Sequence, residues 1–342
     1  MNSRERVIAA LEFSGPDRVP IMHRTLPGAF RVHGEGLQAL YHRYPSDVML
    51  SPTLRAPFAF PRRVGGGVRT GFSIDQWGCQ WRETTNDYLG QVVDHPLSDW
   101  NALDDYVWPD PAAGSESLDE MTAVMQADGH QHYFMAAAGT IMHQMTFLRG
   151  FENTLLDLAD GREEIAFVRD RIADFVLKRI ALWTAAGADG ILIEDDWGTQ
   201  QALLIRPDMW REVFKPTYRR LVEAIHDGGA YAHFHTDGST LAIIPDLVEI
   251  EFDELNPQVW VMDIQELSRQ FAGKVCFRAD LDRQQVLPHG TPIDVAEHVR
   301  VTHAAFGSAK GGYIGYGQIG PDVPLVNAEA MLRTLTTLHL EP

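Results

Sequence analysis

The chain has 342 residues, of which 45% are hydrophobic and 22% charged, a composition typical of folded globular enzymes and unlike disordered or coiled-coil chains. Its formal net charge of −18 argues against a nucleic-acid backbone or an anionic membrane surface as a general partner. Cys79 and Cys276 cannot make a disulfide framework and have no metal-binding spacing. With no signal peptide and no apolar run long enough to span a membrane, the sequence predicts a cytoplasmic protein.

Short apolar runs alternate with helical patterns along most of the chain, which indicates β/α units around a parallel sheet. The runs that predict strands are residues 18–22, 47–52, 132–138, 190–196, 230–237, 252–257, 275–281 and 312–317. Eight strands of this kind predict an α/β fold of the (β/α)₈ TIM-barrel type, formed by residues 1–342 as a single domain.

Residues 53–128 interrupt this alternation near the N-terminal third of the chain. The segment has β-prone residues at alternate positions and turns rich in Gly, Asn and Asp, so we interpret it as a β-rich insertion rather than a separate domain. Because loops that follow barrel strands surround the active site, the insertion is expected to form part of its roof.

Two long helices are predicted on the outside of the barrel. Residues 162–188 carry apolar side chains at helical spacing and end at Gly187, as expected for a helix C-terminus. Residues 206–229 have Pro207 in the first turn and close on a pair of glycines. Pro216 is expected to kink this second helix, because it lacks a backbone N–H.

Polar residues stand at or just after the ends of most predicted strands, where the chemistry of a TIM barrel takes place. They are His23, Arg24, Glu194, Asp196, His235, Asp237, Asn256, Arg278, Tyr316 and Gln318. Side chains alternate along a strand, so His233, His235 and Asp237 share one face, expected to point into the barrel mouth. Such ionisable groups need partners if buried, and they would act as metal ligands, as proton-transfer groups or as a network that braces the barrel rim.

Several segments then resemble the uroporphyrinogen decarboxylase superfamily: "RERVIAALEFSGPDRVPI", "DQWGCQW", "GADGILIEDDWGTQ", "HFHTDGSTLAIIPDLVEI" and "GGYIGYGQIGPDVPLVNAEAM". The resemblance spans nearly the whole chain and implies a TIM barrel, often homodimeric, with its pocket at the carboxyl ends of the strands. It also implies one of two chemistries. One branch decarboxylates the acetate arms of uroporphyrinogen without a cofactor, and the other moves methyl groups to or from a corrinoid or a thiol, commonly with zinc.

The sequence departs from the decarboxylase branch at most of that branch's substrate contacts. Where the branch has a Met-Arg-Gln-Ala-Gly-Arg stretch, "IMHRTLPG" leaves only Arg24 to hold a carboxylate. The tyrosine of the branch's Met-Thr-Tyr segment is replaced by Phe147, and Gly317 stands in the place of a histidine. Asp47, in "PSDVML", opens a predicted strand instead of closing one. An octa-acid porphyrinogen is therefore a poor substrate candidate.

The methyltransferase branch binds zinc through a His-x-Cys pair and a later cysteine. His235 matches the histidine, Asp237 stands at the first cysteine, and the second cysteine's place falls at Gly317 or Gln318. The resemblance thus implies a metal site of His235 and Asp237, completed by Glu194 or His233. Imidazole and carboxylate ligands suit zinc and would favour activation of a methyl ether oxygen or a water. Without a metal, His235 and Asp237 would form an acid/base pair.

We therefore carry three hypotheses. The first is methyl transfer from a small methylated or methoxylated substrate to a corrinoid, on a partner protein, or to a thiol. The second is a decarboxylase or lyase in which Arg24 or Arg278 holds a carboxylate. The third is a non-catalytic barrel that binds a tetrapyrrole or corrinoid. The predicted catalytic residues are His235, Asp237, Glu194 and Asp196, and the predicted substrate contacts are His23, Arg24, Phe147, Asn256, Arg278, Tyr316 and Gln318.

Overall fold

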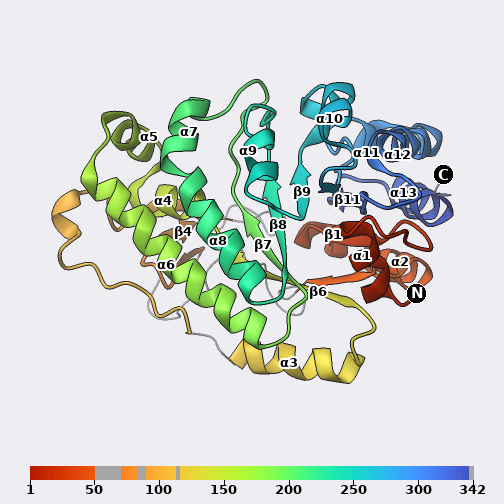
Figure 1. Ribbon diagram of the computed structural model, residues 1–342, viewed down its shortest axis with the longest axis horizontal. Coiled ribbons are helices and arrows are strands. Elements are labelled where there is room, and N and C mark those ends of the chain that lie inside the picture. Colours follow the sequence, from red (N-terminus) through yellow and green to blue (C-terminus); the bar gives the residue numbers. More distant parts are fainter. Residues whose placement is uncertain (51–70, 83–89, 113–115, 339–342) are drawn as a thin grey trace.

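The computed structural model describes residues 1–50, 71–82, 90–112 and 116–338 (Figure 1). Within these residues, eight strands run parallel to their neighbours around a common axis. They are β1 (Ile21–Thr25), β2 (Val48–Leu50), β6 (Tyr133–Gly139), β7 (Gly190–Glu194), β8 (Tyr231–Thr236), β9 (Glu254–Pro257), β10 (Cys276–Phe277) and β11 (Gly315–Ile319).

The eight strands close into a ring. Six of them form one sheet in the order β10-β9-β8-β7-β6-β2, and β1 pairs with β11. At one seam the Asp47 amide donates to the Ile21 carbonyl at 2.7 Å, joining β2 to β1. At the other seam a parallel bridge links Phe277 of β10 to Tyr313, just before β11. The predicted (β/α)₈ barrel is therefore confirmed.

Two predicted strands were placed three residues too early. The first begins at Ile21 rather than at residue 18, because Pro20 has no N–H to give to a ladder. The last begins at Gly315 rather than at residue 312, because Gly311 and Gly312 adopt positive φ and hold the preceding segment out of regular strand geometry. The two strands also end later than predicted, at Thr25 instead of residue 22 and at Ile319 instead of residue 317.

Helices surround the barrel, and their bounds follow the local sequence signals. Gly187 ends the longest helix with φ +92°, as predicted. The predicted helix at 206–229 is two helices that break at Phe214, because Pro216 cannot donate to residue 212. The helices are α1 (Ser3–Leu11), α2 (Pro27–Arg43), α3 (Glu116–Asp128), α4 (Met142–Arg149), α5 (Phe151–Asp160), α6 (Glu163–Ala185), α7 (Pro207–Val213), α8 (Lys215–Asp227), α9 (Ile244–Glu249), α10 (Ile264–Phe271), α11 (Val286–His289), α12 (Pro292–Phe306) and α13 (Leu325–Thr337). None of these helices is both long and apolar enough to cross a membrane.

The insertion contains a small antiparallel sheet of β3 (Phe72–Ile74), β4 (Gln80–Arg82) and β5 (Gln91–Asp94). Asp75 organises its first turn by accepting hydrogen bonds from the Trp77 amide at 2.8 Å, the Cys79 amide at 2.9 Å and the Trp81 indole at 2.6 Å. Residues 51–70, 83–89 and 113–115, which include much of the predicted insertion and the end of the predicted strand 47–52, lie outside the described residues.

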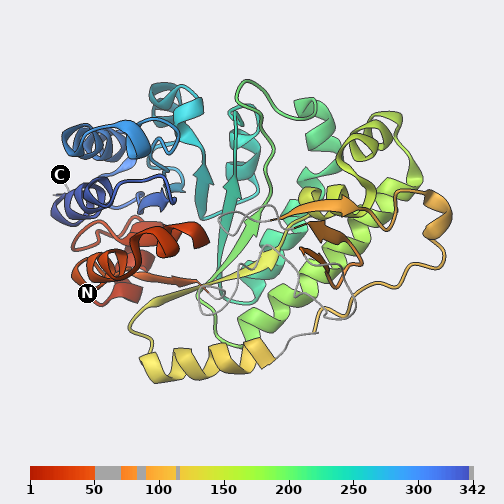
Figure 2. The ribbon, with the colours of Figure 1, turned by 180° about the vertical axis from the view of Figure 1, so that it is seen from behind.

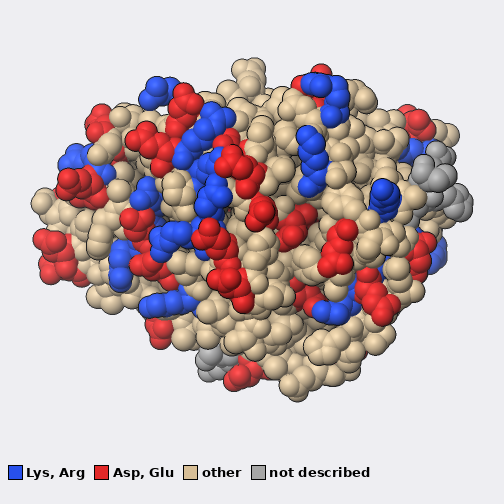
Figure 3. All heavy atoms as spheres, in the orientation of Figure 1, with Lys and Arg blue, Asp and Glu red and all other residues tan. Residues whose placement is uncertain are grey.

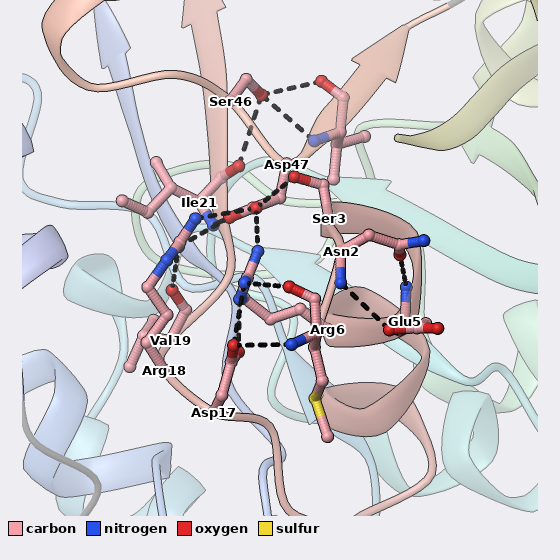
Figure 4. A network of polar contacts seen from close by, with 12 residues as sticks. Asn2, Ser3, Glu5, Arg6, Asp17, Arg18, Val19, Ile21, Ser46 and Asp47 are labelled. Atoms are coloured by element: carbon pink, nitrogen blue, oxygen red, sulfur yellow. Dashed lines mark hydrogen bonds and ion pairs between the residues drawn. The ribbon is translucent and has the colours of Figure 1, made fainter. Parts of the chain in front are cut away.

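The N-terminal helices α1 and α2 lie beside α12 and α13, so the two ends of the chain meet on one flank of the molecule (Figures 1 and 2). Figure 4 shows the polar network that fixes this flank at the amino ends of β1 and β2. The fully buried Asp47 carboxylate accepts from Arg6 at 2.7 Å, from Arg18 at 2.8 and 2.9 Å and from the Ile21 amide at 2.8 Å. This network is at the end of the barrel opposite the strands' carboxyl ends and is structural.

Candidate active site

Three polar residues converge at the carboxyl ends of β7 and β8. Asp196 follows β7, His235 is the penultimate residue of β8, and Asp237 follows β8. His235 Nε2 lies 3.8 Å from Asp196 Oδ1 and 3.7 Å from Asp237 Oδ1. One ligand atom from each of the three residues lies within 4.8 Å of the others, and we call this group the mouth triad. The strand alternation expected for His235 and Asp237 brings them together with Asp196.

Asn256 of β9 sets the orientation of the His235 ring. The Asn256 side-chain nitrogen donates to the Arg278 carbonyl, so its oxygen faces His235 as an acceptor. His235 Nδ1 lies 2.7 Å from that oxygen and therefore carries a hydrogen. The remaining nitrogen, Nε2, points toward two carboxylates. A metal ion placed among these three groups would be held by the imidazole nitrogen and both carboxylates.

Arg283 holds Asp237 from the other side. Its guanidinium donates to Asp237 Oδ2 and, at 3.0 Å, to Gln318 Oε1, and it lies 3.6 Å from Asp280 Oδ2. Among the described residues, the buried Asp237 Oδ1 has no hydrogen-bond partner, although it faces His235. A buried carboxylate oxygen without a partner is costly, so this atom is free to receive a ligand.

His143, near the start of α4, is a site residue that the sequence analysis missed. Its Nε2 lies 3.5 Å from Asp196 Oδ2, and its ring stacks on Phe147 with centroids 5.9 Å apart. Burial opposes a charged imidazole, but Asp196, with Asp195 and Glu194 nearby, raises the pKa of His143 to about 9. Burial alone would raise the pKa of Asp196, but His143 and His235 outweigh burial and lower it. At neutral pH, His143 is therefore a cation beside the mouth triad.

Asp195 has a different role from its neighbour Asp196, because alternation turns it away from the mouth. It is fully buried and accepts from the Ile141 amide at 2.7 Å, the His143 amide at 3.0 Å and the Tyr218 hydroxyl at 2.7 Å. The carboxylate thereby fixes the first turn of α4 against β7 and positions His143.

His233, predicted as an alternative metal ligand, lies inside the barrel instead of at its mouth. It is fully buried, its Nε2 is 2.7 Å from the Tyr133 hydroxyl and its Nδ1 is 2.7 Å from Glu254 Oε2. Two residues along a strand is about 6.6 Å, which places His233 one layer deeper than His235. With both nitrogens engaged, it does not join the mouth triad.

Glu194, the other alternative ligand, also stays outside the triad. Its Oε1 lies 3.7 Å from an Arg24 guanidinium nitrogen. Because Arg24 sits at the end of β1 and Glu194 at the end of β7, this pair spans the mouth of the barrel. The structure therefore places Asp196, rather than Glu194 or His233, beside His235 and Asp237.

The remaining predicted substrate contacts fall into two groups. Arg278, only 2% exposed, lies 4.9 Å from the centroid of the Tyr316 ring, and its Nη2 has no partner among the described residues. Burial raises the pKa of Tyr316 to about 12. His23 instead stacks on Tyr41 of α2, with centroids 4.0 Å apart, and burial lowers its pKa to about 4. Arg278 and Tyr316 thus belong to the interior of the mouth, whereas His23 packs at its edge.

Comparisons with known proteins agree with this architecture. The uroporphyrinogen decarboxylase (URO-D) family matches residues 77–338. A methyltransferase from Methanosarcina mazei superposes with a TM-score of 0.70 at 14% identity, covering 98% of each chain. A B12-independent methionine synthase from Shewanella sp. W3-18-1 gives a TM-score of 0.51 at 12% identity, covering 94% of this chain and 93% of its own.

No curated protein sequence matches the chain. The two structural likenesses, at such low identity, establish the fold alone. The family match is more informative, because it extends from the insertion to the last helix and includes every residue of the mouth triad. The protein belongs to the uroporphyrinogen decarboxylase (URO-D) family.

Proposed function

We propose that the protein is a URO-D-family methyltransferase that moves a methyl group from a small methylated or methoxylated substrate to a corrinoid, held on a partner protein, or to a thiol. We further propose that Asp196, His235 and Asp237 bind a zinc ion. The observation that carries the proposal is the geometry around His235 Nε2, which faces two carboxylates while the nearby Asp237 Oδ1 has no partner.

The residues of the mouth triad fit a zinc ion in chemistry and spacing. Imidazole nitrogen and carboxylate oxygen are both common zinc ligands. Tetrahedral ligands at usual zinc distances lie about 3.3 Å from one another. The separations of 3.7 and 3.8 Å around His235 Nε2 are close to that value. With three protein ligands, a zinc ion would keep one position open and would polarise an oxygen of the substrate as a Lewis acid.

The surrounding residues prepare the triad for an oxygen-containing substrate. Asn256 keeps the His235 Nδ1 protonated and so directs the Nε2 lone pair into the mouth. His143 and Arg283 each balance the charge of one carboxylate, Asp196 and Asp237 respectively. A bound dication would consequently retain much of its positive charge. Retained charge favours activation of a hard oxygen, as in a methyl ether, over activation of a soft sulfur.

A direct assay tests the proposal. The purified protein is mixed with cob(I)alamin and a panel of small methoxylated and methylated compounds, and the appearance of methylcobalamin is followed by absorbance. We expect transfer with at least one compound, its loss on chelation, and its recovery with Zn²⁺. His235→Ala should reduce the rate by about 100-fold. Glu249→Gln, a change on the outer surface, should not alter it. Absence of methyl transfer to cob(I)alamin and to thiols would exclude the proposal.

A second candidate, a carboxy-lyase, is favoured by one specific observation. The side chain of Arg24 is 33% exposed at the mouth and its guanidinium lies 3.7 Å from Glu194, a position from which it can hold a substrate carboxylate. Release of CO₂ from a carboxylated substrate, insensitive to chelators and abolished by Arg24→Met, would select this function over methyl transfer.

A further inference from the structure

A column of polar side chains crosses the interior of the barrel beneath the mouth triad. The Tyr133 hydroxyl lies 2.7 Å from His233 Nε2, and His233 Nδ1 lies 2.7 Å from Glu254 Oε2. Arg278 Nε donates to the other oxygen of Glu254, Oε1, at 3.2 Å. Each of these four residues is 2% exposed or less. Barrel interiors are usually filled by bulky apolar side chains, so this interior column of Tyr133, His233, Glu254 and Arg278 is an unusual filling.

Glu254 and Arg278 form a buried ion pair within the interior column. Burial alone would raise the pKa of Glu254, but Arg278 and His233 outweigh burial and lower it, so the carboxyl is ionised at neutral pH. Taking two charges out of water is costly, and a well-packed apolar pair in the same place is often equally stable. The net gain in stability from the ion pair is therefore small, which points to a role in fixing where its two side chains stand.

Arg278 connects the interior column to the layer of side chains above it. The pairing of β8 with β9 sets His233 opposite Glu254 in the lower layer and His235 opposite Asn256 in the upper layer. While the Arg278 guanidinium binds Glu254, the Arg278 carbonyl accepts a hydrogen bond from the Asn256 side-chain nitrogen. That bond turns the Asn256 oxygen toward His235 Nδ1, which is 2.7 Å away. A chain of contacts thus runs from Glu254 through Arg278 and Asn256 to His235.

The position of the Arg278 carbonyl depends on the Arg278 side chain as well as on the sheet. The ladder between β9 and β10 ends at Phe277, and the Arg278 amide makes one further bond to the Leu255 carbonyl at 3.0 Å. This bond holds the amide side of Arg278, whereas the carbonyl side turns about the ψ dihedral that follows. The guanidinium, bound by Glu254 and 4.9 Å from the centroid of the Tyr316 ring, supplies the second fixed point.

We infer that Arg278 is a positioning residue for the mouth triad. Glu254 anchors its guanidinium, its carbonyl orients Asn256, and Asn256 directs His235 Nε2 toward the two carboxylates of the triad. Arg278, only 2% exposed, acts on the site through Asn256. The effect on the His235 ring needs no metal, whereas the effect on zinc affinity rests on the proposed function.

NMR of the metal-free protein, labelled with ¹⁵N-histidine, tests the orientation of the ring directly. The one-bond ¹H–¹⁵N signal of His235 Nδ1, assigned with His235→Gln, should be resolved in the unaltered protein, because Asn256 holds that hydrogen. We expect Arg278→Met to abolish the signal through fast exchange with water, and Arg278→Lys, which keeps a cation beside Glu254, to restore it in part. If Arg278→Met does not fold because Glu254 is left unpaired, its combination with Glu254→Gln removes both charges and gives the same comparison.

Zinc affinity and a matched control complete the test. Competition with a chelating dye should show Zn²⁺ binding weakened about ten-fold by Arg278→Met, the lower end of the range for groups that orient a metal ligand. Asp47→Ala, which breaks a buried ion pair at the amino ends of the strands, should preserve both the His235 signal and the affinity.

The outcomes separate this inference from the proposed function. A His235 signal that is absent from the unaltered protein, kept in Arg278→Met or lost equally in Asp47→Ala would overturn the positioning role. An unchanged zinc affinity of Arg278→Met, in a protein that does bind zinc, would overturn it as well. A protein that binds no zinc, but loses the His235 signal in Arg278→Met alone, would refute the proposed zinc site and support the positioning role.

Discussion

The orientation of His235 depends on one neighbouring residue, Asn256, whose oxygen accepts the Nδ1 hydrogen. Replacing Asn256 by Ala frees the ring to turn, and partners of this kind are typically worth 10–100-fold in metal affinity. We therefore expect Asn256→Ala to weaken Zn²⁺ binding, measured by competition with a chelating dye, by about that factor. Asn327→Ala is the matched control, because Asn327 is an equally buried amide that donates to the Leu287 and Gly290 carbonyls, away from the mouth. Equal weakening by both changes would show that Asn256 acts only through stability.

The alternation of side chains along β8 predicted part of the site from the sequence. It correctly grouped His235 with Asp237, because one strand carries both toward the same face. It could not show that His233 lies deeper in the barrel than His235 and Asp237, because alternation gives the face of a strand and not the position along the barrel axis. His143 and Arg283 were missed because they lie in segments after the strands, where no periodicity points at the mouth. Inspection of the turn after residue 139 would have found His143.

Among the elements, the amino end of β2 is braced by Asp47, which neutralises Arg6 and Arg18. Removing one partner of a buried ion pair leaves an uncompensated charge, at a cost of about 3–5 kcal/mol. Asp47→Ala should lower the free energy of unfolding, measured by urea denaturation, by an amount in that range. The rate of the proposed methyl transfer per folded molecule should not change, because the network lies at the amino ends of β1 and β2 and the mouth triad lies at the carboxyl ends of the strands. A variant as stable as the original protein would contradict the bracing role.

Element types were predictable from the sequence, and element ends were less so. Apolar runs identified all eight barrel strands, but Pro20 and the glycines at 311 and 312 delayed the first and last of them. The pattern at 206–229 predicted helix correctly, and the kink expected at Pro216 is a complete break at Phe214, between α7 and α8.

At the scale of the whole molecule, one face mixes charges of both signs. In Figure 3, acidic and basic side chains alternate over α7, α8 and α9. Arg211 and Lys215 there pair with Asp246 at 2.9 and 2.7 Å, and Arg219 pairs with Glu249 at 3.0 Å. The Arg219–Glu249 pair is exposed and is worth less than about 1 kcal/mol, so added salt should change the overall stability little through it.

Acid should destabilise the molecule through His23. Burial lowers the pKa of His23 to about 4 in the folded protein, from an ordinary value of 6.5. Between these values the unfolded chain binds the proton and the folded chain does not, so stability is complete above about pH 6.5 and falls as the pH drops toward 4. The loss is at most about 3 kcal/mol. Urea denaturation across this range should show a flatter profile for His23→Gln than for the exposed His42→Gln. Identical profiles would contradict the assignment.

The most direct test of the central claim is the metal content of the purified protein, measured by elemental mass spectrometry after dialysis against zinc. We predict about one zinc ion per chain, retained by Glu194→Gln and lost by Asp237→Ala, because Asp237 belongs to the mouth triad and Glu194 pairs with Arg24 instead. A protein that transfers methyl groups at full rate with no bound metal, or that loses zinc equally in both variants, would contradict the claim that Asp196, His235 and Asp237 hold the ion.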